Sequence, residues 1–107
     1  MTLPMFGFTK SDTTLRIKIN SDKFDASVVD EFTTKVEAHW QSDIKSVSVD
    51  VSSLEYIDSS GIGALLALSR RLSNSAEAVC LENPRASVVE ILEMLRLHRV
   101  FKIEHEV

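Results

Sequence analysis

The chain has 107 residues, of which 44% are hydrophobic and 26% are charged. These values are typical of a globular domain, and a chain of this length can bury most of the surface that it exposes when unfolded. They exclude a disordered tail protein and predict a single domain over residues 1–107. The formal net charge is −4 and the 12 basic residues are scattered, which disfavours nucleic acid as a partner.

The sequence shows neither a secretion signal nor a membrane span. Residues 1–10 lack the long apolar region of a signal peptide, and the longest strongly apolar stretch, residues 62–68, is far below the roughly 20 residues that cross a bilayer. The single cysteine, Cys80, lies in an apolar run that predicts a buried strand thiol without a disulfide partner. We therefore expect a cytoplasmic protein that does not insert into a membrane.

Apolar residues alternate with polar residues over residues 14–20 and again over residues 46–52, which predicts two strands with one buried face each. The positions expected to face the core are Leu15, Ile17, Ile19, Val47, Val49 and Val51. Short apolar runs over residues 78–83 and 100–103 predict two further strands. Residues 5–8 predict an additional edge strand beside the first one.

Apolar residues at steps of three and four predict three helices, over residues 24–40, 57–73 and 85–98. Asp25 or Ser27 is available to cap the first helix. The expected buried stripes are Val29, Phe32, Val36 and Trp40 in the first helix, Ile62, Leu65, Leu66, Ser69 and Leu72 in the second, and Val88, Ile91, Leu92 and Leu95 in the third.

Strands that alternate with helices indicate an α/β domain with parallel strand pairs. The two alternating strands each keep a polar face. This pattern indicates that helices pack on one face of the sheet while the other face is partly solvated.

Two serines stand where the second helix must begin. Asp58, Ser59, Ser60 and Gly61 follow the end of a predicted strand and a short connection. Backbone N–H groups in the first turn of a helix are unpaired and the dipole end is positive, so a phosphate on either serine is tolerated there. Gly61 and Gly63 leave that turn without β-carbons, so another protein can approach the hydroxyl groups.

Spacing alone leaves a plainer interpretation open, because Asp and Ser are also the usual N-cap residues. The segment is not a nucleophile elbow, since Ile57 stands two residues before Ser59 where G-x-S-x-G requires glycine, and no nucleotide-binding glycine pattern is completed. The histidines, His39, His98 and His105, show no ligand spacing, so we expect neither a metal nor another cofactor.

The segment VSVDVSSLEYIDSSGIGALLALSRRL, with FDAS before the first helix and NPRASVVEILEMLRLHRVFKI behind it, resembles the STAS domain of bacterial anti-sigma-factor antagonists over nearly the whole chain. The mark of that family is an apolar residue, then D-S-S-G or D-T-S-G, then an apolar residue and Gly or Ala. This mark is intact from Ile57 to Gly63. The resemblance implies a mixed sheet of four or five strands with helices packed on one face.

By position, the resemblance implies that Ser59 is the phosphorylated residue, with Ser60 as a nearby second hydroxyl group and Asp58 orienting the loop. The kinase-docking surface of the family surrounds this site. On this chain it would include Asp25 in the loop before the first helix and an exposed turn made of Gly61, Ile62 and Gly63.

The resemblance also implies partner switching as the mechanism. The unphosphorylated protein would bind an anti-sigma factor that is also a serine kinase, and would thereby free a sigma factor. Phosphorylation would reverse the binding, and a PP2C-type phosphatase would reset the switch. The turn at residues 20–25 has no glycine and is one residue longer than the family pattern, and many members continue into a helix after the last strand. These departures bear on which partner is bound.

Two other classes of function compete with this interpretation. A STAS subunit of a membrane lipid transporter would bind an ATPase as a fixed component, although such members often lack the full D-S-S-G pattern. An enzyme that used Ser59 as a nucleophile would need a general base, and no histidine precedes Ser59 within a recognisable motif. We therefore expect a binding protein and not an enzyme.

Overall fold

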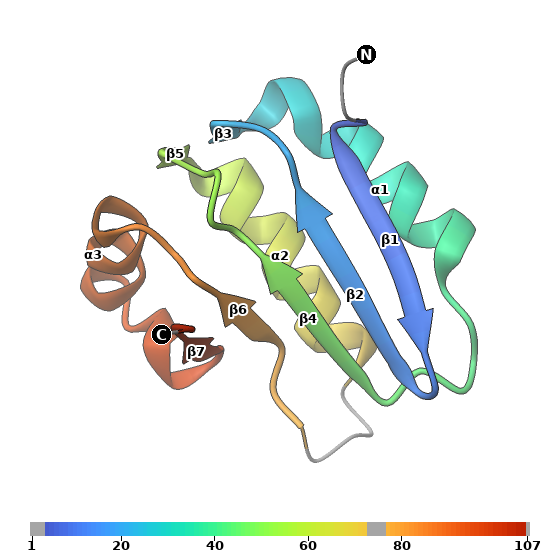
Figure 1. Ribbon diagram of the computed structural model, residues 1–107. Coiled ribbons are helices and arrows are strands. Elements are labelled where there is room, and N and C mark those ends of the chain that lie inside the picture. Colours follow the sequence, from blue (N-terminus) through green and yellow to red (C-terminus); the bar gives the residue numbers. More distant parts are fainter. Residues whose placement is uncertain (1–3, 73–76, 107) are drawn as a thin grey trace.

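The computed structural model describes residues 4–72 and 77–106. Figure 1 shows a five-stranded mixed sheet in the order β1-β2-β4-β6-β7 and a second, two-stranded sheet of β3 and β5. The strands are β1 (Phe6–Ser11), β2 (Thr14–Ile19), β3 (Lys23–Phe24), β4 (Ser46–Asp50), β5 (Tyr56–Ile57), β6 (Cys80–Glu82) and β7 (Lys102–Glu104). The helices are α1 (Ala26–His39), α2 (Ser59–Arg71), α3 (Ala86–Met94) and the short 3-10 helix η1 (Leu97–Arg99).

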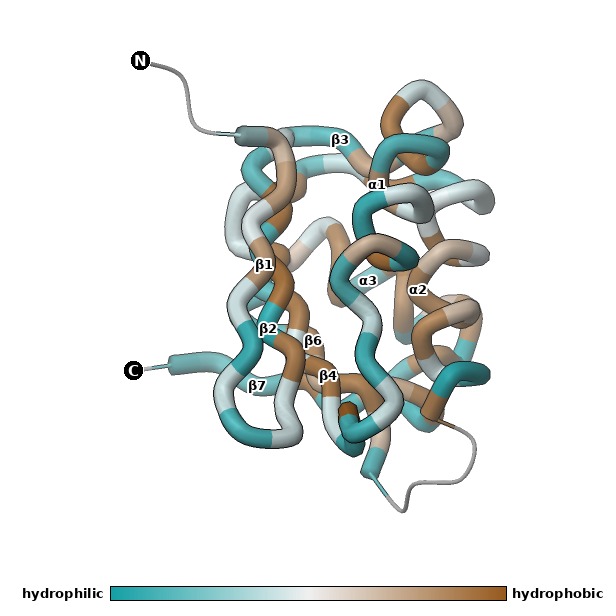
Figure 2. The backbone as a smooth tube through the Cα atoms, turned by 90° about the vertical axis from the view of Figure 1, so that its right-hand side faces the viewer, coloured by the Kyte–Doolittle hydropathy of each residue, from teal (hydrophilic) through white to brown (hydrophobic). Residues whose placement is uncertain are grey.

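The helices α1, α2 and α3 lie on one face of the large sheet, as Figure 2 shows. Strand β1 pairs antiparallel with β2, and the pairs β2–β4, β4–β6 and β6–β7 are parallel. The structure therefore confirms the predicted mixed α/β sheet with helices on one face. The predicted edge strand is also present, and as β1 it extends beyond the expected residues 5–8.

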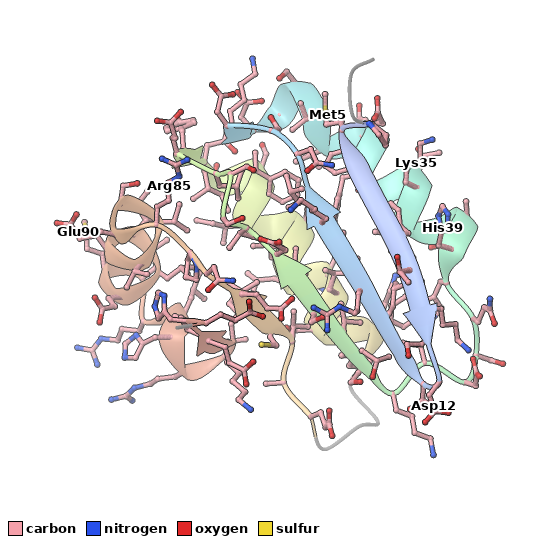
Figure 3. All side chains as sticks on the ribbon, viewed as in Figure 1. Met5, Asp12, Lys35, His39, Arg85 and Glu90 are labelled. Carbon is pink, nitrogen blue, oxygen red and sulfur yellow. The ribbon has the colours of Figure 1, made fainter. Side chains whose placement is uncertain are left out.

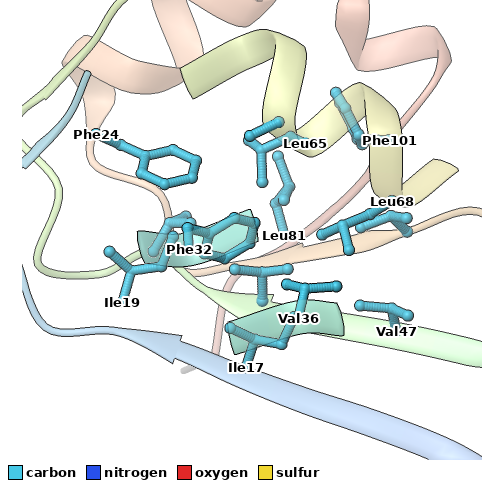
Figure 4. Packing of buried hydrophobic residues seen from close by; sticks show 14 of the residues in the cluster. Ile17, Ile19, Phe24, Phe32, Val36, Val47, Leu65, Leu68, Leu81 and Phe101 are labelled. Atoms are coloured by element: carbon cyan, nitrogen blue, oxygen red, sulfur yellow. The ribbon is translucent and has the colours of Figure 1, made fainter. Parts of the chain in front are cut away.

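The hydrophobic core lies between the large sheet and the helices. All six strand positions predicted to face inward have exposed fractions of at most 2%. Figure 4 shows Phe32 and Val36 of α1 and Leu65 and Leu68 of α2 in this core. Each fully buried side chain of this kind stabilises the fold by about 1.5–3 kcal/mol, so the contact between sheet and helices is the main source of stability.

The predicted helix stripes are wrong at several positions. In α1 the buried valine is Val28, at the start of the row that continues through Phe32 and Val36, and Val29 lies half-buried beside that row. In α2 the row of buried residues runs through Leu68, whereas the predicted positions Leu66 and Ser69 are half-buried. In both helices the buried row differs from the predicted one because each helix packs against the other helix as well as against the sheet. The predicted end of the second helix at residue 73 lies outside the described residues.

The third helix ends four residues earlier than predicted. Helix α3 stops at Met94 because Arg96 adopts a left-handed backbone conformation with φ 59°. A left-handed conformation costs a residue with a β-carbon roughly 1–2 kcal/mol. The chain then forms η1, and Leu95, predicted to be buried, is 54% exposed.

The face of the large sheet that carries no helix is polar, as predicted. Arg16 of β2 reaches across β4 to Glu82 of β6, with its Nη2 atom 3.2 Å from both carboxylate oxygens. On the neighbouring strands β2 and β4, the Nζ atom of Lys18 lies 3.3 Å from Oδ2 of Asp50, which is directly opposite in the ladder. The Lys18–Asp50 pair is largely exposed and contributes little stability, whereas the Glu82 carboxylate is nearly buried and depends on Arg16 as its partner.

Cys80 lies in a strand, as predicted, but its thiol is on the polar face and only half-buried, so the prediction that it is buried is wrong. The side chains of a strand alternate between its faces, and Leu81 takes the inward position in β6. Desolvation, together with a hydrogen bond to the Glu104 carboxylate, raises the pKa of the Cys80 thiol to about 11.

We expect Cys80 to react slowly with iodoacetamide in the folded protein. At pH 8 a thiol with this raised pKa is about a hundredfold less ionised than an ordinary cysteine, and the thiolate is the reactive form. Alkylation followed by mass spectrometry should show slow modification at pH 8 and fast modification after unfolding in urea. Equal rates in the folded and unfolded protein would contradict the raised pKa.

Candidate functional site

The small sheet of β3 and β5 brings the starts of α1 and α2 together (Figure 1). Its two strands are parallel, with Phe24 opposite Ile57 in the ladder. Asp25 and Asp58 follow directly on these two residues, and each one caps the helix that begins next. Two strand ends and two helix N-termini that are more than 30 residues apart in sequence therefore meet at one end of the molecule.

Phe24 anchors this arrangement in the core. Its ring is fully buried and packs edge-on against Phe32 at a centroid distance of 4.9 Å and against Phe6 at 6.4 Å. Edge-to-face packing of this kind adds about 0.5–1.5 kcal/mol to the gain from burial. The position of β3, and with it the position of Asp25, is therefore set by the aromatic core.

Both aspartates use their carboxylates as helix caps. Asp58 accepts a hydrogen bond from the backbone N–H of Gly61 at 3.0 Å. Asp25 accepts one from the backbone N–H of Ser27 at 3.0 Å and one from the hydroxyl group of Ser27 at 2.5 Å. The hydroxyl bond is the main cause that lowers the pKa of Asp25 below its usual value. One aspartate carboxylate thus caps each of the two helix N-termini that meet here.

The two serines of the motif differ in exposure. Ser59 is the first residue of α2 and is exposed, whereas Ser60 is half-buried. Within the ranges 4–72 and 77–106, no side-chain hydrogen bond engages either hydroxyl group. Since Asp58 is the cap, Ser59 is free of a structural hydrogen-bonding task and its hydroxyl group is accessible.

The predicted exposed turn is wrong for Gly61 and Ile62. Gly61 is buried, and a β-carbon there would lie 2.1 Å from the carbonyl oxygen of Phe24 and 2.9 Å from the Ile57 side chain. Ile62 is only 9% exposed because it turns into the core. Only Gly63 has open space around the position of a β-carbon. Gly61 therefore serves close packing of α2 against β3, and not the approach of a partner.

Several surface residues near the site were assigned no role from the sequence. Tyr56 of β5 is 53% exposed, and Lys23 of β3 lies opposite it in the ladder. Arg85, at the cap position of α3, donates from Nε to the carbonyl oxygen of Ser52 at 3.0 Å, and Figure 3 shows it beside the end of β5. The fold brings Arg85 close to the site, and its position in the sequence does not indicate this.

A hollow of about 440 Å³ lies on the polar face of the sheet, and its walls include Arg16, Ser48 and Glu82 but none of the predicted site residues. In the described part of the chain, no group of three or more His, Cys, Asp or Glu side chains could hold a metal ion. Across those same residues, no helix has the length and apolar character needed to cross a bilayer.

We expect Asp58→Ala to lower the free energy of unfolding by about 1–2 kcal/mol, because it removes the side-chain cap of α2. Asp58→Asn keeps a capping oxygen and should cost much less. Urea denaturation followed by circular dichroism measures both variants. Equal stability of wild type and Asp58→Ala would show that the cap bond contributes nothing.

Comparison with known proteins places this geometry in a family. The family model described as the STAS domain matches residues 8–107. The chain therefore belongs to the STAS domain family.

Solved structures show the same fold. The anti-sigma factor antagonist SpoIIAA in its unphosphorylated form is 23% identical, with a TM-score of 0.77 over 94% of this chain and 89% of that chain. Phosphorylated SpoIIAA from Bacillus is 21% identical, with a TM-score of 0.70 over 94% and 92%. An anti-sigma-factor antagonist (STAS) domain protein from Planctomyces limnophilus is 17% identical, with a TM-score of 0.82 over 97% and 92%.

A membrane protein also shares the fold. The murine anion transporter Slc26a9 is 21% identical, with a TM-score of 0.64 over 80% of this chain and 14% of that chain. At these levels of sequence identity, the similarity shows the fold alone. The function has to be inferred from the site.

Proposed function

We propose that the chain is an anti-sigma-factor antagonist that works by phosphorylation-controlled partner switching. In its unphosphorylated form it binds an anti-sigma factor that is also a serine kinase, and this binding releases a sigma factor. Phosphorylation of Ser59 ends the binding, and a PP2C-type phosphatase restores it. The observation that carries the proposal is the exposed, unbonded Ser59 hydroxyl group at the start of α2, inside an intact D-S-S-G motif.

The electrostatics of the site favour such a switch. The N-terminus of a helix carries a partial positive charge, so a phosphate on Ser59 does not disrupt α2. The phosphate would however bring about −1.5 to −2 charge next to the carboxylates of Asp58 and Asp25. Desolvating that concentration of negative charge in an interface is costly, while the fold itself is unaffected.

The docking surface that we propose is smaller than the one expected from the sequence. Asp25, Asp58, Ser60 and Gly63 stay on it as surface residues around Ser59. Gly61 and Ile62 act beneath it by setting the position of α2. Tyr56 joins the surface as an exposed aromatic side chain, a type that is enriched in protein interfaces.

The protein is proposed to be a cytoplasmic binding protein without catalytic activity, in which residues 1–107 form one STAS domain. Ser59 has no histidine or other general base bonded to it in the described part of the chain. SpoIIAA, which shares the fold, is described as an anti-sigma factor antagonist and has been solved in an unphosphorylated and a phosphorylated form.

A second candidate is a STAS subunit that binds the ATPase of a membrane lipid transporter. The observation in its favour is the shared fold of the domain in the transporter Slc26a9. A fixed subunit has no use for an exposed serine at a helix start, so the switch is the better supported function.

Intact-mass analysis of the protein from its native cells separates the two functions. The switch predicts two species that differ by the mass of one phosphate group, with the heavier one converted to the lighter one by a PP2C-type phosphatase. Capture of a sigma-factor-binding kinase by the lighter species alone completes the test. A single unmodified species that copurifies with a transporter ATPase would favour the second candidate.

A further inference from the structure

The polar face of the large sheet, which carries no helix and which Figure 3 presents to the viewer, contains the hollow of about 440 Å³. Short side chains of two neighbouring strands line its floor, with Ser48 of β4 directly opposite Cys80 of β6. The longer charged side chains that line it are Arg16, Glu82, Lys102 and Glu104. A volume of this size is within the range of about 300–1,000 Å³ that is usual for small-molecule sites.

The floor residue Ser48 has a buried hydroxyl group without a partner. Its neighbours Val47 and Val49 face the core, so the alternation of side chains along β4 turns Ser48 to the polar face. The residue is only 8% exposed, and among the described residues its Oγ atom has no hydrogen-bond partner. Buried hydroxyl groups normally have a partner, because leaving water without a new hydrogen bond costs free energy.

A polar face that is merely solvated does not explain this hydroxyl group. Ser46, two residues earlier in the same strand, pairs with the Thr14 hydroxyl group at 2.6 Å. The Oγ atom of Ser48 has neither such a pair within the described ranges nor contact with solvent. Ser48 is therefore the position in the hollow where a bound molecule would supply a missing hydrogen bond.

An ion pair crosses the sheet beside Ser48. Arg16 of β2 and Glu82 of β6 are separated by β4, and Nη2 of Arg16 bonds to both carboxylate oxygens at 3.2 Å. A guanidinium group also carries N–H donors on Nε and Nη1, and no residue in the described part of the chain accepts a hydrogen bond from these atoms of Arg16. The Arg16 side chain is 54% exposed, so it has room to shift and admit a ligand to Ser48.

The charges that line the hollow favour a neutral ligand. Glu77, Glu82 and Glu104 outnumber Arg16 and Lys102, which disfavours an anion. Arg16 is paired with Glu82, and Nζ of Lys102 lies 3.0 Å from Glu104, so an ion of either sign would have to compete with an existing partner. A hydroxyl group both donates and accepts hydrogen bonds, so it can bond to these groups while the ion pairs are kept.

We propose that the hollow binds a small neutral molecule with several hydroxyl groups, a sugar or another polyol. Ser48 exchanges a hydrogen bond with one hydroxyl group of the ligand, Arg16 donates to a second, and the Glu82 carboxylate accepts from a third. The site is on the sheet face opposite the helices, whereas Ser59 is the first residue of α2. The inference therefore does not depend on the phosphorylation switch.

The test is NMR titration of the ¹⁵N-labelled full chain with glucose, ribose, myo-inositol and glycerol, each up to about 100 mM, a concentration that detects weak binding. At least one of these compounds should shift the amide signals of β4 and β6 to saturation, with a dissociation constant of about 1–10 mM. The signals at the start of α2 should not move. Sodium phosphate and ethylamine hydrochloride supply an anion and a cation, and neither should give a saturable shift.

Ser48→Ala should weaken this binding about threefold to tenfold, because it removes one hydrogen bond. Arg16→Lys keeps the charge but loses the planar set of donors, and it should weaken binding in the same direction. Ser69→Ala is the matched control, since Ser69 also has a buried, unpartnered Oγ atom in the described part of the chain but does not line the hollow. It should bind like the wild type.

Urea denaturation should show that the three variants are folded and that Ser48→Ala is no less stable than the wild type. A loss of stability in Ser48→Ala would give its hydroxyl group a structural task and overturn the proposal. Equal binding by Ser48→Ala and the wild type, or no saturable shift with any of the four compounds, would overturn it as well. Saturation by phosphate or ethylamine alone would contradict a neutral ligand.

Discussion

Gly61→Ala is expected to destabilise the protein by about 3 kcal/mol or more, at the upper end of the cost of overpacking. The new β-carbon would lie 2.1 Å from the carbonyl oxygen of Phe24, which is backbone and cannot rotate away. Helix α2 would have to move from β3, and the junction of the two helix starts would open. The measurement is the free energy of unfolding from urea denaturation.

Gly63→Ala is the matched control in the same turn. Apart from its chain neighbours and the backbone of its own helix, no atom lies within 4 Å of the added β-carbon, and alanine is favoured over glycine in a helix by about 0.5–1 kcal/mol. This variant should be as stable as the wild type or slightly more stable. Equal destabilisation by both substitutions would contradict the packing role of Gly61.

Ser59→Asp is expected to weaken binding of the kinase partner, and phosphorylation of Ser59 to weaken it about a hundredfold or more. A carboxylate brings one negative charge and fewer acceptor oxygens than a phosphate, so its effect has the same direction but is smaller. Ser59→Ala should bind constitutively. Isothermal titration calorimetry with the purified partner measures the three affinities.

The Ser59 variants should all fold normally, because Asp58 and not Ser59 caps α2. Ser60→Ala should bind and be released like the wild type, which makes it the matched control. Tight binding of the kinase partner by the phosphorylated protein would contradict the proposed switch.

Long periodic segments allowed much of the fold to be predicted. Leu15, Ile17 and Ile19 alternate strictly with polar residues, and a pattern of this length fixes both the strand and its buried face. The residue types at the start of α2 indicated a helix cap, but the sequence left Asp58 and the two serines open, and the structure shows that Asp58 is the cap.

The features that could not be predicted from the sequence depend on contacts between distant segments. Strands β3 and β5 have two residues each, which is too short for any periodicity. The burial of Gly61 depends on Phe24, and the position of Arg85 beside β5 depends on the packing of α3. In the sequence, glycine at the start of a helix suggests that a partner can approach the helix there. In the structure, β3 fills the space beside Gly61.

The end of α3 could not be predicted for a different reason. The apolar spacing continues through Leu95, but Arg96 takes a backbone conformation that its residue type disfavours. Tertiary packing of η1 and Phe101 overrides the local preference.

Phosphopeptide mapping shows directly whether Ser59 is the residue that the kinase modifies. The wild type, Ser59→Ala and Ser60→Ala are incubated with ATP and the serine kinase that Ser59→Ala captures from native cells. We expect phosphate on Ser59 in the wild type and in Ser60→Ala, and none in Ser59→Ala. Phosphate on Ser60, with Ser59→Ala still fully phosphorylated, would contradict it.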